Sequence, residues 1–169
     1  LEEMGGFDES YRDASGEDND LSYRMRAARF RLRFDPEARV SHVHPVRLDR
    51  YLKEQARHGF WRMKLYSAHP SKVSGDDYSG PVDFLEPPVA LALLGLAPLA
   101  GFPIVPSILR AGLFFLFFLA GWITWRLVRF TDDPRLFWFF PVRFLRAFAR
   151  GLGLAAGVWR FWILRRVNR

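Results

Sequence analysis

The chain contains no cysteine, and acidic residues are scarce in its second half. Without cysteine there is no disulfide framework, no thiolate metal ligand and no cysteine nucleophile. Residues 1–80 hold 14 Lys+Arg and 14 Asp+Glu, whereas residues 81–169 hold 11 Lys+Arg but only 4 Asp+Glu, so the second half carries the whole net charge of +7. Because the surplus arginines flank apolar runs, this distribution indicates a membrane protein with basic cytoplasmic flanks and argues against nucleic-acid binding.

Two stretches of the second half lack charged residues altogether. Val89 to Leu109 is a run of 21 uncharged residues, and Ala111 to Trp125 adds 15 more. A membrane span needs about 20 apolar residues. We therefore expect residues 81–130 to form a transmembrane hairpin, with helices at 88–104 and 108–127 joined by a proline-rich turn. The ten arginines from Arg126 onward place both ends of the hairpin, and the polar half with them, on the cytoplasmic side.

The segment 131–169 is basic and aromatic. Arginines at positions 143, 146 and 150 share one face of a predicted helix, and apolar residues at 144, 145, 148 and 152 share another. This pattern predicts an amphipathic helix at the membrane interface, with its arginines toward anionic lipid. A re-entrant segment is the alternative.

The polar half alternates between helical and strand-like patterns. The order predicted from periodicity is a helix beginning at Gly16 or Asp18, a half-buried strand at 29–34, a turn at 35–37, a second strand at 39–44, a helix at 48–66 and a linker at 67–88. The first residue is leucine and no signal-like segment precedes the polar half. We therefore expect the chain to be the C-terminal part of a longer protein or a truncated gene product.

Three carboxylates crowd the start of the first predicted helix. Glu17, Asp18 and Asp20 lie within four residues of one another, directly after Gly16. Such a cluster can deprotonate a hydroxyl group or hold a divalent cation. The alternative is that these acids only stabilise a helix N-terminus, where negative charge is favoured.

The order of four short motifs resembles the C-terminal part of family 2 glycosyltransferases, over about residues 4–66. The motifs are Gly-Gly-Phe-Asp-Glu at 5–9, Gly-Glu-Asp-Asn-Asp-Leu at 16–21, Val-Ser-His at 40–42 and Arg-His-Gly at 57–59. The resemblance implies an α/β fold, namely residues 1–80 as the C-terminal part of a GT-A domain with a mixed sheet. It also implies inverting, hexosyltransferase-type transfer from a nucleotide-sugar. The family's nucleotide-binding half is absent from this sequence, so we expect the fragment alone to be inactive.

The resemblance also assigns roles to individual residues. It makes Asp18 the general base, with Glu17 beside it to orient the acceptor or tune the base, and makes His42 a ligand of Mn²⁺ or Mg²⁺, with His44 as the alternative. The acceptor side would comprise Gly6, Phe7, Asp8, Asp20, Arg57 and Trp61. Arg57 could equally lie on a solvated helix face.

The implied partners are a nucleotide-sugar donor, a lipid-linked or cell-envelope glycan acceptor and membrane lipids. The segment from Gln55 to Trp61 departs from the Gln-x-x-Arg-Trp motif of processive members, which favours a single-addition enzyme. The competing hypothesis is a non-catalytic membrane module whose acidic loop is structural.

Overall fold

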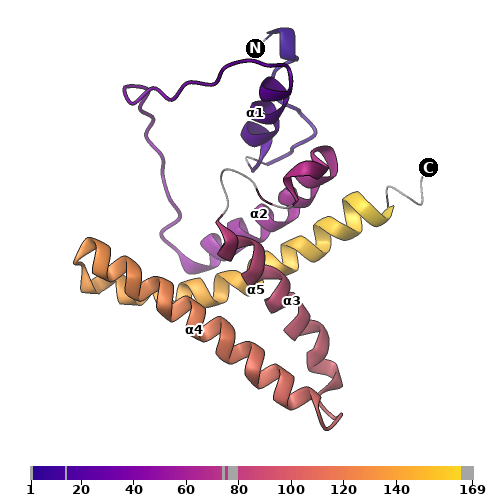
Figure 1. Ribbon diagram of the computed structural model, residues 1–169, viewed down its shortest axis with the longest axis vertical. Coiled ribbons are helices and arrows are strands. Elements are labelled where there is room, and N and C mark those ends of the chain that lie inside the picture. The colour runs from indigo at the N-terminus through magenta and orange to yellow at the C-terminus, as the bar shows by residue number, and fades with distance from the viewer. Residues whose placement is uncertain (1, 14, 74, 76–79, 165–169) are drawn as a thin grey trace.

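The computed structural model describes residues 2–13, 15–73, 75 and 80–164, and every regular element in them is helical. The α-helices are α1 (Glu17–Ala27), α2 (Leu48–Ala68), α3 (Pro81–Leu96), α4 (Val105–Thr131) and α5 (Phe139–Val158), as Figure 1 shows. Short 3₁₀ turns lie at Glu2–Met4, Pro70–Lys72, Ala97–Leu99 and Pro134–Trp138, and a π-helical turn at Trp159–Ile163 continues α5.

The predicted mixed sheet, and with it the α/β fold class, is wrong. Among the described residues there is no strand, and the two segments predicted as strands form one long loop from α1 to α2 (Figure 1). Residues 30–44 are all exposed, and Phe34 retains 87% of its accessible surface. Alternation of Arg with apolar residues is a local pattern, whereas a strand also needs a neighbour to satisfy its backbone hydrogen bonds. No described segment provides that neighbour.

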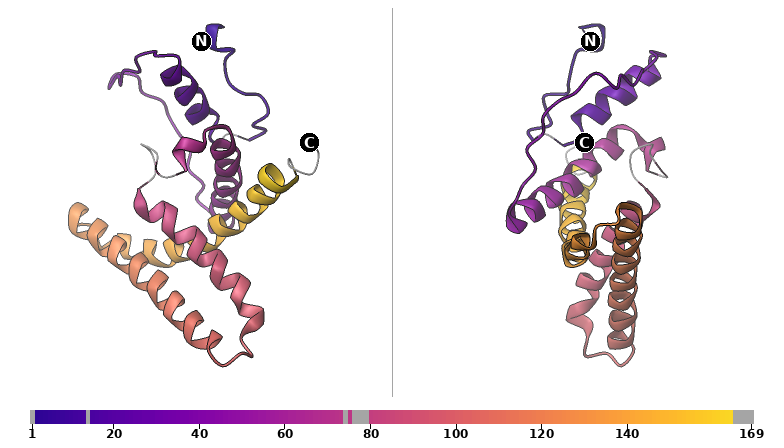
Figure 2. Two further views of the ribbon diagram at one scale, coloured as in Figure 1. Left: turned by 45° about the vertical axis from the view of Figure 1, so that its right-hand side comes forward. Right: turned by 90° about the vertical axis from the view of Figure 1, so that its left-hand side faces the viewer.

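Helices α3 and α4 form a hairpin that projects away from α1 (Figures 1 and 2). Residues Val82–Leu99 and Val105–Thr131 are long and apolar enough to cross a membrane. The first helix starts at Pro81 instead of residue 88, because the chain accommodates Asp83 and Glu86 within it. Ala90 and Leu93 pack with Leu116 of α4 and Ala147 of α5, while the outward face of α4 stays exposed.

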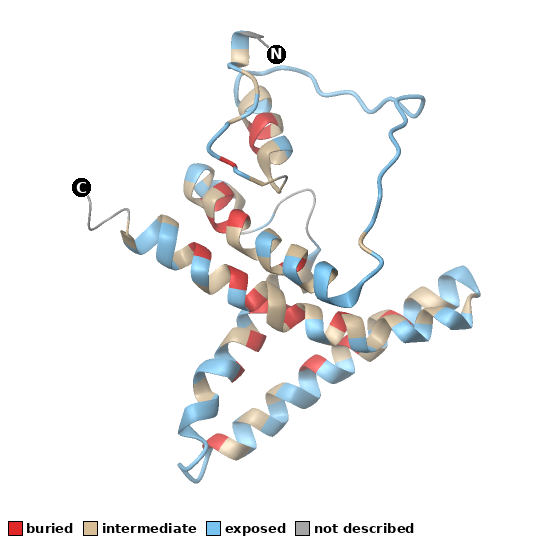
Figure 3. Cartoon of the chain, turned by 180° about the vertical axis from the view of Figure 1, so that it is seen from behind, coloured by how far each residue is buried: buried red, intermediate tan, exposed pale blue. Residues whose placement is uncertain are grey.

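Helix α5 lies at the centre of the helical assembly, where it contacts α2, α3 and α4. Figure 3 shows buried residues gathered where α2, α3 and α5 meet. The arginines predicted to face anionic lipid instead contact carboxylates of α3. Glu86 binds Arg143 at 3.2 Å and Arg146 at 3.1 Å, and Asp83 binds Arg150 at 2.7 Å. Glu86 is only 3% exposed, so these ion pairs, rather than lipid headgroups, neutralise that face of α5.

Glycines allow α2 and α5 to approach to backbone contact. A Cβ atom added at Gly153 would overlap the carbonyl oxygen of Ala56, and one added at Gly59 would overlap the carbonyl oxygen of Arg150. Both helices therefore present a residue without a side chain at the crossing. This contact fixes α2, which carries much of the site described next, against the rest of the protein.

Candidate functional site

The acidic cluster lies at the N-terminus of α1. Gly16 precedes the helix with a φ of 101°, a left-handed conformation that favours glycine. The backbone N–H of Ser15 donates to Glu17 Oε2 at 2.6 Å, and that of Asn19 donates to Asp18 Oδ1 at 2.8 Å. The Asp18 side chain is exposed, so its second oxygen can meet a ligand. Both acids lie in the first turn of α1, where acidic side chains are favoured by the positive end of the helix dipole.

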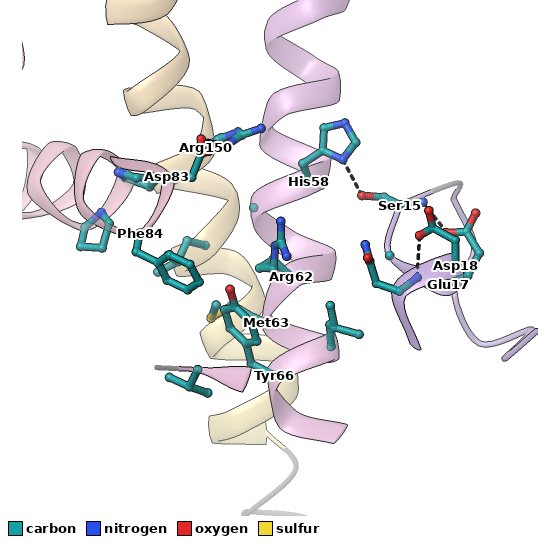
Figure 4. Close-up of a pocket in the computed structure, with 18 of the residues that line it drawn as sticks. Ser15, Glu17, Asp18, His58, Arg62, Met63, Tyr66, Asp83, Phe84 and Arg150 are labelled. Atoms are coloured by element: carbon teal, nitrogen blue, oxygen red, sulfur yellow. Dashed lines mark hydrogen bonds and ion pairs between the residues drawn. The ribbon is translucent and has the colours of Figure 1, made fainter. Parts of the chain in front are cut away.

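Ser15 ties this acidic loop to α2. Its Oγ lies 2.8 Å from Nδ1 of His58, and Figure 4 shows the bond spanning the gap between loop and helix. Burial lowers the pKa of His58, and the positive charge of Arg150 lowers it further. Nε2 of the imidazole lies 3.9 Å from a carboxylate oxygen of Glu54. In the tautomer that carries its proton on Nε2, His58 accepts a hydrogen bond from the Ser15 hydroxyl at Nδ1.

A cavity of about 570 Å³ opens beside this loop. Its lining comes from the loop and start of α1, from α2, α3 and α5, and from the long loop between α1 and α2 (Figure 4). Glu17, Asp18 and His42 all contribute to it. The structure thus brings together both residues predicted to be catalytic and the predicted metal ligand.

Two other predicted residues, Gly6 and Asp20, hold the N-terminal segment in place. Asp20 is 5% exposed, and its oxygens lie 2.8 Å from Arg24 Nε and 2.8 Å from His69 Nε2. Arg24 also donates to the carbonyl oxygen of Gly6 at 2.6 Å. Asp20 therefore joins α1 to the end of α2 and lies outside the cavity lining.

The Asp8 carboxylate binds Lys64 of α2 at 2.9 Å. Hydrogen bonds from Ser10, together with Lys64, lower the pKa of Asp8 to about 2, so it is ionised at neutral pH. The neighbouring Phe7 is exposed and, like Asp8, lies outside the cavity lining.

Arg57 and Trp61 meet Asp13. Arg57 Nη1 lies 3.4 Å from Asp13 Oδ1, and the indole N–H of Trp61 donates to Asp13 Oδ2 at 3.1 Å. The Trp61 ring is buried against Tyr11 and Phe161, with ring centroids 5.5 Å and 5.8 Å away. Neither residue lines the cavity, and both fasten the N-terminal segment to α2.

The residues that the structure describes do not fit a divalent cation. Among the described residues, no group of three His, Asp or Glu side chains could hold a metal ion. The rings of His42 and His44 lie 4.5 Å apart, centroid to centroid, but no third side chain in the described part of the chain completes a metal site with them.

Sequence reasoning overlooked Ser15 and His58 as site residues. They are 43 positions apart, and neither belongs to a periodic pattern that would place them together. The only available signal was the position of His58 inside the Arg-His-Gly motif.

We expect His58 to make folding stability depend on pH. Because its pKa is lowered in the folded state, stability is greatest above the unfolded value of about 6.5 and falls as the pH drops through the folded pKa. Urea unfolding of the wild type between pH 8 and pH 5 measures the slope of the free energy of unfolding against pH. The His58→Gln variant should show a shallower slope, and identical slopes would rule out this role for His58.

Comparison with known proteins gives a relationship over part of the chain. No family model matches it, and no solved structure matches it. Over 74 residues the chain is 38% identical to the pre-mycofactocin glycosyltransferases of Mycobacterium tuberculosis strains CDC 1551 / Oshkosh and ATCC 25618 / H37Rv. The matched region is 44% of this chain and 15% of each relative. The chain is thus related to a glycosyltransferase over less than half of its length.

Proposed function

We propose that this chain forms the acceptor and base side of a membrane-anchored, inverting glycosyltransferase that uses a nucleotide-sugar. One observation carries the proposal: Asp18 and Glu17 line a cavity of about 570 Å³ in a chain that is 38% identical over 74 residues to glycosyltransferases. The motif order that resembles family 2 members supports inversion. The acceptor is a lipid-linked or cell-envelope glycan.

In the proposed reaction, Asp18 removes a proton from an acceptor hydroxyl. The hydroxyl oxygen attacks the anomeric carbon of the donor, and the bond from that carbon to the nucleotide diphosphate breaks. The diphosphate leaves with the electron pair, and the configuration at the carbon inverts. A carboxylate within hydrogen-bond reach of the hydroxyl can perform this general-base step. Glu17, fixed by the Ser15 N–H at 2.6 Å, orients the acceptor beside Asp18.

Helices α3 and α4 supply the proposed membrane anchor. Their candidate spans leave the ends of the hairpin on the same side, where α1 and α2 lie (Figure 1). The ten arginines from Arg126 onward support a cytoplasmic location for that side, because basic residues flank membrane spans mainly in the cytoplasm. The donor and the site would thus share one compartment.

The experiment is a donor panel with the native gene product that carries this sequence, kept in its membranes. Radiolabelled nucleotide-sugars are supplied, and membrane extracts and pre-mycofactocin, for which the relatives are named, serve as acceptors. We expect one donor to be consumed and NMR to show inverted anomeric configuration in the product. Retained configuration would contradict the mechanism, and no transfer from any donor would favour the non-catalytic membrane module.

A further inference from the structure

The two ends of the cavity differ in chemistry. One end is polar and comes from the loop and first turn of α1, with Ser15, Glu17, Asp18 and Asn19. The other end is largely apolar and is lined by Phe84, Pro87 and Pro88 of α3 and by Leu154 of α5. Figure 4 shows Glu17 and Asp18 on one side of α2 and Phe84 on the other, with Arg62 and Tyr66 between them.

Charged residues near the apolar end neutralise one another. Asp83 and Arg150 line the cavity there, but they bind each other at 2.7 Å, and Arg150 also donates to Gln55 at 2.7 Å. Because these two side chains already form an ion pair with each other, they are poor binding partners for an additional charged ligand. Apolar contact with Phe84, Pro87 and Leu154 is the interaction that this end offers.

The apolar end is also built on a candidate membrane span. Phe84, Pro87 and Pro88 belong to α3 and lie within Val82–Leu99. The acidic end lies on α1, the helix farthest from the α3–α4 hairpin in Figure 1. The cavity therefore runs from a polar loop toward the membrane side of the protein.

We propose that this cavity binds an amphipathic acceptor. Its hydroxyl-bearing head lies at the Ser15–Asn19 end, and its apolar group lies against Phe84, Pro87 and Leu154. The inference rests on the proposed function and narrows its acceptor class. The volume of about 570 Å³ suits a small ligand, since such sites span roughly 300–1,000 Å³. Each methylene buried at the apolar end should strengthen binding about fourfold.

The test measures binding and needs no turnover. The native gene product is placed in phosphatidylcholine nanodiscs with an octyl β-glucoside that carries a diazirine in its chain. After illumination, mass spectrometry locates the label. We expect it on peptides containing Phe84 or Leu154. Phenyl β-glucoside should displace the probe at a concentration at least tenfold lower than methyl β-glucoside, because only the phenyl group occupies the apolar end.

Variants separate this site from lipid exposure and from catalysis. Leu154→Asn and Phe84→Asn should each reduce labelling of the site about tenfold. Two variants are used so that the test still stands if one of them does not fold. Phe114→Asn, on the outward face of α4 and 70% exposed, should leave labelling unchanged. Asp35→Asn, at an exposed position outside the cavity lining, should also keep the label. If the proposed function failed but the cavity still bound an amphipathic ligand, the wild type would be labelled at this site and would transfer no sugar. The two failures are therefore distinguishable.

Two further arms distinguish the source of the acceptor. Displacement by phenyl β-glucoside alone identifies a soluble amphipathic acceptor, whereas displacement by monoglucosyl diacylglycerol in the disc identifies a membrane-resident one. Either result supports the proposal. Equal potency of phenyl and methyl β-glucoside, or label spread along α4 without displacement by any competitor, would overturn it.

Discussion

Gly153→Ala should destabilise the protein by about 3 kcal/mol or more. The new Cβ would overlap the carbonyl oxygen of Ala56, and a backbone atom cannot rotate away as a side chain can. Overpacking typically costs about 1–3 kcal/mol, and here both helix backbones would have to separate. Because α2 carries His58 and borders the cavity, the acidic loop would lose its support as well. Urea unfolding in detergent micelles, followed by circular dichroism, measures the free energy of unfolding.

Gly95→Ala is the matched control for this prediction. Gly95 lies in α3, and a Cβ atom added there would meet nothing within 4 Å. Alanine is favoured over glycine in helices by about 0.5–1 kcal/mol, so this variant should be as stable as the wild type or slightly more stable. If Gly153→Ala unfolded at the same urea concentration as Gly95→Ala, the close crossing of α2 and α5 would be refuted.

Local sequence patterns correctly located several helices. The acidic residues after Gly16 indicated a helix start, and α1 begins at Glu17. The predicted helix at 48–66 corresponds to α2 at Leu48–Ala68. Capping chemistry and helical periodicity are properties of short segments, so they could be recognised without knowledge of the fold.

Features that depend on distant parts of the chain could not be predicted in this way. The alternation at 29–34 predicted a strand, but no other described segment pairs with it. The charges of Asp83 and Glu86 excluded them from the predicted span, although arginines about 60 residues later compensate them inside the fold. Asp20 resembled its acidic neighbours in sequence, yet Arg24 and His69 hold it in a buried position.

The residues predicted for the site also fall into two groups, those that line the cavity and those that hold the fold together. The resemblance to family 2 glycosyltransferases predicted catalytic roles for Glu17 and Asp18, and both line the cavity. Trp61 was predicted to contact the acceptor, but it packs against Tyr11 and bonds to Asp13. An aromatic residue on a helix can serve either purpose, and only the packing of the N-terminal segment decides between them.

Asp18→Asn should lower the rate of glycosyl transfer by about 100- to 10,000-fold, the usual contribution of a general base. Asparagine preserves the size of the side chain and can still accept the hydrogen bond from the Asn19 N–H, but it cannot take up the acceptor proton. Affinity for the donor should not change, because the carboxylate acts on the acceptor. Asp35→Asn is the matched control, since Asp35 is exposed and outside the cavity lining.

The most direct measurement is single-turnover transfer by the native gene product in membrane vesicles, with nucleotide-sugar binding measured in parallel. The account predicts that Asp18→Asn slows the chemical step at least 100-fold with an unchanged donor dissociation constant, whereas Asp35→Asn behaves as the wild type. A transfer rate for Asp18→Asn within about threefold of the wild type, with donor binding intact, would contradict the assignment of Asp18 as the base.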